Sequence, residues 1–195
     1  MMSTVVLVRH GETDWNLAGR LQGQEDTELN ETGIRQAKLC GAFLARESWD
    51  VILTSPFKRA RKTADIIGQE VKIAPLMEVS DLRERDFGEA SGLTHQEMAL
   101  RFPDGRITGQ EERLILARRA MGVLEYILRD YSGKKLVVVS HGGVINSILA
   151  TLSRGEIGSG KTTLKNACLS RLVHDHGSWI IDTYNFTEHL HPAAK

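Results

Sequence analysis

Residues 4–16 read Thr-Val-Val-Leu-Val-Arg-His-Gly-Glu-Thr-Asp-Trp-Asn, and the first five form a short apolar, largely β-branched run. Such a run predicts a buried strand. The strand ends at Arg9, His10 and Gly11, and open α/β sheets bind ligands at the carboxyl ends of their strands. The guanidinium of Arg9 suits phosphate or carboxylate, the imidazole of His10 can be a nucleophile or base, and Gly11 permits a sharp turn. Alternatively, His10 only hydrogen-bonds its neighbours.

The composition of the 195 residues, 41% hydrophobic and 26% charged, is typical of a globular enzyme domain, and we expect one domain over residues 1–195. Lys+Arg and Asp+Glu both number 25, so no overall field favours nucleic acid or an anionic membrane. Neither a signal peptide nor a membrane-spanning apolar run is recognisable, which predicts a cytoplasmic protein. Cys40 and Cys168 lie too far apart in sequence to indicate a metal knuckle or a disulfide framework.

The rest of the chain alternates between strand and helix patterns. Apolar runs predict buried strands at residues 51–54 and 136–139, a short strand at 71–79 broken by Pro75, and two strands at 167–174 and 179–184 joined by a tight turn. Helical spacing predicts helices at 32–44, 55–69, 94–101, 111–129 and 144–152, the first two beginning at Thr32 and Ser55-Pro56, with polar connections at 14–31 and 80–92. We therefore expect an α/β fold: a three-layer α/β/α sandwich with a mostly parallel central sheet and helices on both faces.

Three predicted strands end in polar groups that should meet at one edge of such a sheet: Arg9-His10, Thr54-Ser55 and Ser140-His141. Arg59 lies in the first turn of the helix after Ser55, near the same edge. Arg61 lies about 200° around that helix from Arg59 and should point elsewhere. Helix amino termini at this edge add backbone N–H groups. The sequence therefore predicts a local cationic pocket with two arginines and two histidines in a neutral protein.

Two histidines in one pocket are compatible with a metal site or with phosphoryl chemistry. Arginines repel a cation and favour phosphate, and they should lower the histidine pKa so that His10 stays neutral and nucleophilic. Phosphoryl transfer also needs an acid for the leaving oxygen. Glu84, in a loop beyond a strand, is a candidate, because a bound phosphate dianion would raise its pKa. Sequence physics alone favours the alternative that Glu84 is a solvated loop carboxylate.

Several motifs in order resemble the histidine phosphatase superfamily, the phosphoglycerate-mutase-like proteins. The resemblance spans nearly the whole chain, and it is carried by Arg9-His10-Gly11-Glu12-Thr13 with Trp15-Asn16, Gln22-Gly23, Asp26, Leu29, Gly33, Ser55-Pro56-Phe57-Lys58-Arg59-Ala60, Thr63-Ala64, Leu82-Arg83-Glu84, Ser140-His141-Gly142 and Glu188-His189-Leu190. The first motif is moderately specific alone, and the ordered set is highly specific.

The resemblance implies a phosphohistidine mechanism without a cofactor or metal. His10 would be the nucleophile, and Glu84 would protonate the leaving oxygen and then activate water. The phosphoryl group would be held by Arg9, Asn16, Arg59 and His141, and the substrate side would be lined by Gln22, Gly23 and the backbone of Gly142. The implied partner is a small phosphomonoester rather than nucleic acid or membrane, and a homodimer is compatible with the sequence.

Within the family, the short stretch between Glu84 and His141 is more similar to the broad-specificity phosphatase branch than to the mutases. The chain departs from the pattern of this branch at two places, so the family does not indicate which residues form that part of the pocket wall. Gly88-Glu89-Ala90-Ser91-Gly92 replaces Gly-x-Trp-Glu-Gly, and Gly109-Gln110-Glu111-Glu112 matches a Gly-Glu-Ser motif only in part. We expect a permissive phosphatase for small phosphorylated metabolites. The alternatives are a phosphoglycerate mutase, an α-ribazole phosphatase, or a non-catalytic module that binds phospho-ligands.

Two other patterns have competing explanations. Residues 155–162, Gly-Glu-Ile-Gly-Ser-Gly-Lys-Thr, match the P-loop pattern, but a helix precedes them and a strand follows, which inverts the P-loop context. We expect a glycine-rich connection, near the pocket mouth, rather than a nucleotide site. His174-x-His176 and His189-x-His191 have no evident third ligand, and we expect surface or terminal histidines rather than a metal site.

Overall fold

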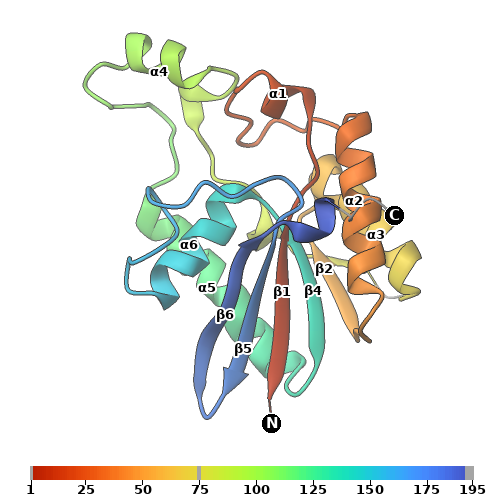
Figure 1. The fold of residues 1–195 in the computed structure, drawn as a ribbon. Helices are drawn as coiled ribbons and strands as arrows, with labels where there is room; N and C mark the ends of the chain where they lie inside the picture. The colour runs from red at the N-terminus through yellow and green to blue at the C-terminus, as the bar shows by residue number, and fades with distance from the viewer. Residues whose placement is uncertain (1, 74–75, 192–195) are drawn as a thin grey trace.

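In the computed structural model, which describes residues 2–73 and 76–191, a six-stranded sheet forms the centre of the molecule (Figure 1). The strands are β1 (Ser3–Arg9), β2 (Val51–Thr54), β3 (Leu76–Glu78), β4 (Lys135–Ser140), β5 (Leu169–Asp175) and β6 (Ser178–Phe186). Their order is β3-β2-β4-β1-β5-β6; the first four are parallel, whereas β5 and β6 pair antiparallel. The expected mostly parallel central sheet is confirmed.

Helices cover both faces of this sheet. α2 (Glu31–Leu44) and α3 (Lys58–Val71) lie on one face, and α5 (Arg113–Asp130) and α6 (Gly142–Leu152) lie on the other (Figure 1). Alternate side chains of β1 serve the two cores: Val5 and Leu7 pack with α5 and α6, and Val6 and Val8 with α2 and α3. The three-layer α/β/α sandwich is confirmed. No helix in residues 2–73 and 76–191 is long and apolar enough to span a bilayer.

Two short helices lie beyond the carboxyl ends of the parallel strands. α1 (Asp14–Leu17) follows β1, and α4 (His95–Arg101) belongs to the long excursion between β3 and α5 (Figure 1). The segments touch, because Arg20 donates a hydrogen bond to the carbonyl of Gly92 and forms an ion pair with Glu97 at 3.0 Å. The described part of the chain also contains three 3₁₀ turns: η1 (Ser80–Leu82), η2 (Gly88–Ala90) and η3 (Glu188–Leu190). The helix α1, η1 and η2 lie where only polar connections were expected.

The starts of two helices differ from the sequence prediction. α2 is capped by Asn30, whose side chain accepts from the N–H of Gly33 at 2.9 Å, whereas Thr32 accepts from Arg35 inside the first turn. Helix α3 begins at Lys58 rather than at Ser55-Pro56. The hydroxyl of Ser55 accepts from the N–H of Phe57 at 3.3 Å, and it also contacts the ring of His141, which follows β4. A neighbouring residue, Asn30, therefore supplies the cap of α2 in place of Thr32, and Ser55 shares its hydroxyl with a distant partner.

Other boundaries shift by a few residues. Helix α3 continues to Val71, so β3 is only three residues long, and the expected break at Pro75 lies outside the described residues. Helix α5 begins at Arg113, two residues later than expected. The tight turn between β5 and β6 is confirmed, with positive φ at His176 (47°) and Gly177 (81°), as in a type I′ hairpin.

Candidate active site

Three adjacent strands deliver polar side chains to one edge of the sheet. β2, β4 and β1 are neighbours, and Ser55, His141 and His10 directly follow them. The ring centroids of His10 and His141 are 5.1 Å apart, and Nε2 of His141 lies 2.8 Å from the Ser55 hydroxyl oxygen. Residues separated by up to 131 positions in sequence thus form one buried cluster, because the carboxyl ends of parallel strands share an edge.

His10 is held in one tautomer. Its Nδ1 lies 2.7 Å from the carbonyl oxygen of Gly11, which can only accept, so Nδ1 carries the proton. In neutral His10 the lone pair is therefore on Nε2. The pKa of His10 lies well below its ordinary value, because the side chain is buried and because Arg9 and Arg59 repel a further positive charge. His10 is thus a neutral base or nucleophile near neutral pH.

Arg9 and Arg59 place two buried guanidinium groups beside His10. Arg9 donates Nη1 to the carbonyl of Leu164, and Arg59 donates to the carbonyls of Glu25 and Gly23, at 2.5 and 2.9 Å. The Nε atoms of both arginines are buried without a hydrogen-bond partner among the described residues. Burial lowers the pKa of Arg59 to about 10, which still leaves it charged near pH 7. Two buried donors without a protein acceptor are suited to an anion.

His141 completes this corner. It follows β4 and occupies the N-cap position of α6, and its Nδ1 is also buried without a hydrogen-bond partner among the described residues. Burial and the positive charges of Arg59 and Arg9 keep its pKa well below the ordinary value. We call Arg9, His10, Arg59 and His141 the phosphoryl corner, after the group that the sequence analysis expects them to hold.

Glu84 reaches the same edge from the loop after η1. The N–H of Gly143 donates to both carboxylate oxygens, at 3.0 and 3.1 Å, and the N–H of Arg85 donates to one of them at 2.8 Å. A Cβ built on Gly142 would lie 3.6 Å from Nε of Arg9 and 4.0 Å from Oε2 of Glu84. The carboxylate of Glu84 therefore faces the phosphoryl corner across the first turn of α6. It is 9% exposed, so it is not a solvated loop carboxylate.

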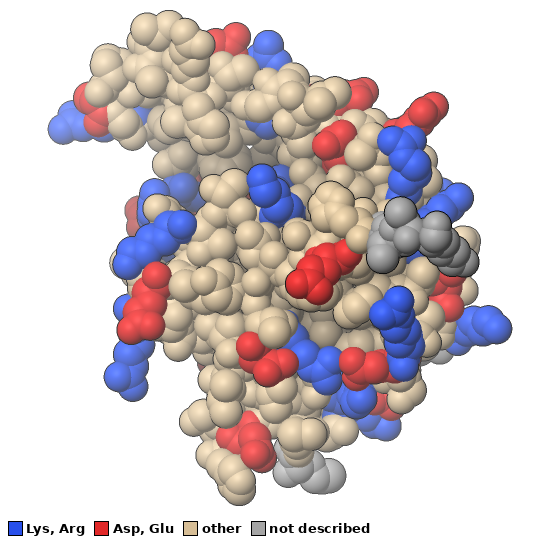
Figure 2. All heavy atoms as spheres, viewed as in Figure 1, with Lys and Arg blue, Asp and Glu red and all other residues tan. Residues whose placement is uncertain are grey.

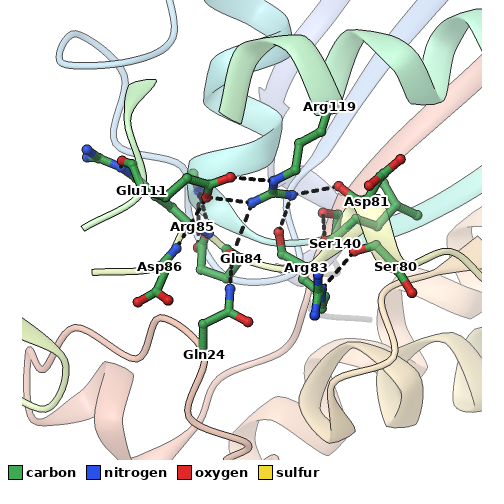
Figure 3. Close-up of polar contacts among 12 residues, drawn as sticks. Gln24, Ser80, Asp81, Arg83, Glu84, Arg85, Asp86, Glu111, Arg119 and Ser140 are labelled. Atoms are coloured by element: carbon green, nitrogen blue, oxygen red, sulfur yellow. Dashed lines mark hydrogen bonds and ion pairs between the residues drawn. The ribbon is translucent and has the colours of Figure 1, made fainter. Parts of the chain in front are cut away.

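Arg119, on α5, holds the loop that carries Glu84 (Figure 3). Its guanidinium donates to the backbone carbonyls of Asp81 and Arg83 at 2.7 Å and to that of Glu84 at 3.2 Å. It also pairs with the carboxylate of Glu111 at 2.7 Å, with both side chains largely buried. The sequence analysis missed Arg119, because on a helical wheel it is only one charged residue of an amphipathic helix.

Backbone contacts fix the loop after His10. Gly11 and Gly33 approach so closely that a Cβ on Gly11 would lie 2.5 Å from the carbonyl oxygen of Gly33. Asn166, which sequence analysis also missed, donates to the carbonyls of His10 and Gly11 at 3.2 and 3.3 Å. It donates further to the side chain of Asn16 at 3.1 Å. Asn16 thus lies beside the His10 loop, with its side-chain oxygen occupied by Asn166 and Thr13.

Gln22 and Gly23 lie on the other side of Arg59. The carbonyl of Gly23 accepts from Arg59, and the side-chain oxygen of Gln22 is already engaged by the hydroxyl of Thr27. Gly23 has a positive φ of 52°, and a Cβ there would lie 2.9 Å from Oγ of Ser91. Ser91, in the segment that departs from the family pattern, therefore packs against the Gln22-Gly23 wall. As expected, Arg61 points away, toward Asp65 and Glu78.

A cavity of about 640 Å³ adjoins the phosphoryl corner. Arg9 belongs to both, Gly142, which follows His141, lines the cavity, and residues 159–160 and 162–164 form part of its wall. The glycine-rich loop at 155–162 therefore borders the site. In the chain it lies between helix α6 and strand β5, and Gly158 packs closely against α6. It has neither the preceding strand nor the following helix of a phosphate-binding P-loop.

The paired histidines lie outside this site. His174 packs on the ring of Trp179, His176 is exposed beside Asp175, and His189 is buried, with Nε2 3.0 Å from the carbonyl of Ala167. Within residues 2–73 and 76–191, no three His, Cys, Asp or Glu side chains gather in a way that could hold a metal ion.

A buried cationic corner around a neutral histidine, at the carboxyl edge of an α/β sheet, defines a class of proteins that handle phosphoryl groups. The sequence profile of the histidine phosphatase superfamily (branch 1) matches residues 5–187. The chain belongs to this superfamily.

Similar proteins carry phosphatase or phosphoglycerate mutase names, the latter including a probable phosphoglycerate mutase of Proteus mirabilis (strain HI4320), 33% identical over 97% of this chain and 95% of its own. An uncharacterised phosphatase, PhoE, of Bacillus subtilis (strain 168) is 42% identical over 97% of both chains. A metal-independent phosphoserine phosphatase of Arabidopsis thaliana is 36% identical over 97% of this chain and 84% of its own. The native structure of a mycobacterial glucosyl-3-phosphoglycerate phosphatase matches with a TM-score of 0.85 and 27% identity, covering 96% of this chain and 100% of its own. These matches identify the chain as a phosphatase of this superfamily.

Proposed function

We propose that the protein hydrolyses small phosphomonoesters through a phosphohistidine on His10, without a metal ion or another cofactor. The observation that carries this proposal is the hydrogen bond between Nδ1 of His10 and the Gly11 carbonyl. It leaves the Nε2 lone pair for attack, while burial and the charges of Arg9 and Arg59 keep the ring neutral. The positive charge of the two arginines supplies the electrostatic stabilisation that phosphoryl transfer needs.

In the first step, Nε2 of His10 attacks phosphorus and the bond to the ester oxygen breaks. Nε of Arg9, Nε of Arg59 and Nδ1 of His141 are the donors proposed for the phosphoryl oxygens, with Asn16 assisting. Glu84 is the proposed acid: it gives a proton to the leaving oxygen, so the product leaves as an alcohol. Nδ1 of His10 keeps its proton throughout, held by Gly11.

In the second step, the Glu84 carboxylate takes a proton from water, and the water oxygen attacks phosphorus. The bond between phosphorus and Nε2 of His10 breaks, which regenerates neutral His10 and releases inorganic phosphate. The hydrogen bonds from Gly143 and Arg85 to Glu84 support this role, because they fix the carboxylate at the rim of the corner. Gln22, Gly23 and the backbone of Gly142 are proposed to line the substrate side.

The proposed substrate range is broad. Its support is the cavity of about 640 Å³ beside the corner, which is within the range of small-molecule sites. The relative named a metal-independent phosphoserine phosphatase is the support from similar proteins for a metal-free reaction.

The proposal is tested by phosphate release from p-nitrophenyl phosphate in EDTA. Wild type and the exposed-residue control His176→Ala should be active, and His10→Ala should lose at least about 1,000-fold in kcat, as is typical of a removed nucleophile. Acid-labile phosphate on the wild-type chain, absent from His10→Ala, would identify the intermediate. Activity retained by His10→Ala contradicts the mechanism, and phosphate binding without release from any ester indicates a binding module. Return of the phosphoryl group to a second hydroxyl rather than to water indicates a mutase.

A further inference from the structure

A buried histidine, His189, lies behind the turn that supports the loop of His10. It belongs to η3, which packs against α2 (Figure 1). Figure 2 shows basic and acidic side chains interspersed over the face drawn, but His189 is only 9% exposed and is not part of that charged surface. Its ring lies against the rings of Phe43 and Phe186, with centroids 5.5 and 5.8 Å away. On packing alone a phenylalanine would serve here as well, so the imidazole needs another explanation.

Only one ring nitrogen of His189 has a partner among the described residues. Nε2 lies 3.0 Å from the carbonyl oxygen of Ala167, which can only accept, so Nε2 carries the proton. Nδ1 is buried without a hydrogen-bond partner in residues 2–73 and 76–191, and an unpaired buried acceptor costs stability. Compared with a phenylalanine, the histidine therefore carries a cost at Nδ1 and gains one hydrogen bond, to Ala167.

Ala167 is held in an unfavourable backbone conformation. It is the third residue of a β-turn that is closed by a hydrogen bond from the N–H of Cys168 to the carbonyl of Lys165 at 3.2 Å. Its φ is 54°, in the left-handed region that glycine adopts freely and alanine avoids. The contacts around the turn must therefore hold it in place. His189 binds the carbonyl of Ala167, and the N–H of Ala167 donates to the carbonyl of His10 at 3.2 Å.

The same turn holds the loop that carries His10. Asn166, the second residue of the turn, donates Nδ2 to the carbonyls of His10 and Gly11. The Gly11 carbonyl also accepts the proton on Nδ1 of His10, so it receives hydrogen bonds from both side chains. A rotation of the turn at Ala167 would move these donors, and with them the carbonyl that orients the His10 ring. His189 is thus connected to His10 through the two backbone groups of one residue, Ala167.

We infer that His189 is a positioning residue for His10: by holding the carbonyl of Ala167, it fixes the turn whose N–H groups hold the carbonyls of His10 and Gly11. The inference rests on the proposed function and deepens it. It assigns the placement of the nucleophile to a side chain that belongs neither to the phosphoryl corner nor to the lining of the adjoining cavity.

Two substitutions separate the hydrogen bond of His189 from its packing. His189→Phe keeps a ring and loses the donor, whereas His189→Gln loses the ring and keeps an N–H donor near the position of Nε2. With p-nitrophenyl phosphate, His189→Phe should lower kcat/KM about tenfold, as the loss of one hydrogen bond allows, and leave the inhibition constant of inorganic phosphate within about twofold. His189→Gln should keep kcat/KM within about threefold of wild type.

His191→Phe is the matched control, because His191 is an exposed histidine at the end of the same segment. It should have the kinetics of wild type. Wild-type kcat/KM in His189→Phe overturns the inference. A loss in His189→Gln as large as that in His189→Phe also overturns it, because packing of the ring would then explain both.

The proton on Nδ1 of His10 gives a second readout, which does not depend on activity. In ¹⁵N-labelled wild type, this buried proton should give a slowly exchanging NMR signal, identified by its absence from His10→Ala. The signal should exchange at least about tenfold faster in His189→Phe and stay as in wild type in His189→Gln and His191→Phe. An unchanged signal in His189→Phe overturns the inference. The expected pattern of signals in a protein that hydrolyses no ester supports the positioning of His10 and contradicts only the proposed function.

Discussion

The guanidinium of Arg119 donates a hydrogen bond to the backbone carbonyl of Glu84, 3.2 Å away and 35 residues apart in sequence (Figure 3). The same group holds two preceding carbonyls of the loop, so the position of the Glu84 carboxylate depends on a side chain that need not touch the substrate. Gln24 donates to the same carbonyl of Glu84 from the opposite side, at 2.6 Å. Arg119 is thus a positioning residue.

Replacing Arg119 should impair reactions that need an acid more than those that do not. Arg119→Leu should lower kcat/KM for an alkyl phosphate by about 100-fold, within the range of general acid catalysis, and for 2,4-dinitrophenyl phosphate by less than about threefold. The reason is that dinitrophenolate leaves without a proton. Arg118→Leu is the control. Equal losses on both esters would indicate general damage to the fold, and Arg119→Lys should restore part of the alkyl phosphate activity.

Gly143 leaves room for the Glu84 carboxylate. A Cβ at this position would collide with Oε1 of Glu84, so Gly143→Ala should push the carboxylate out of line and reduce kcat by roughly 100-fold. Gly122→Ala, in the interior of α5, meets no atom within 4 Å and should instead raise stability by up to about 1 kcal/mol. Steady-state kinetics and thermal unfolding of both variants check this prediction. Full activity in Gly143→Ala would contradict it.

The buried histidines should make the protein less stable in acid. The folded-state pKa values of His10 and His141 lie well below the ordinary value of 6.5, so below that pH the unfolded chain binds protons that the folded chain does not. Above about pH 6.5 neither histidine lowers the free energy of unfolding. Below that pH, each lowers it by up to about 1.4 kcal/mol for every pH unit. The free energy of unfolding, measured with urea at pH 5.0 to 7.5, should depend less steeply on pH for His141→Asn than for wild type. His176→Asn, at an exposed position, should leave the slope unchanged.

The glycine-rich loop should not be a nucleotide site. Lys161 is exposed, and the loop lacks the strand and helix order of a P-loop, so Lys161→Ala should retain activity within about twofold of wild type. Addition of ATP and Mg²⁺ should leave phosphate release from p-nitrophenyl phosphate unchanged. A large loss in Lys161→Ala, or a requirement for nucleotide, would restore the P-loop interpretation.

The strand ends could be predicted from sequence because each is marked locally. A buried run that stops at Arg9-His10, or at Ser140-His141, carries both the strand and its polar end in a few adjacent residues. Helix starts were less predictable, since Ser55 has the features of a cap but bonds to His141, a partner 86 positions away. The short helix α1 was missed within a segment read as a connection.

The supporting residues of the site could not be predicted by periodicity. Arg119 and Asn166 act through backbone carbonyls on distant segments, and a carbonyl leaves no mark in the sequence. Gly143 follows a recognisable motif, yet its importance depends on the approach of Glu84, 59 positions away. Such contacts appear only when the chain is folded, because their partners are chosen by topology rather than by spacing.

The loop from Ser153 to Thr163 is fastened to α6 by the close packing of Gly158 and by the amide of Asn146, which donates to the carbonyl of Thr162 at 3.0 Å. The reacting groups, by contrast, stand on strand ends and on the Glu84 loop. In the proposed mechanism, one part of the molecule therefore performs bond making and breaking, and another shapes the space around the rest of the ligand. Proteins with this architecture can therefore change their substrate preference through substitutions in an exposed loop, while the reacting groups stay the same.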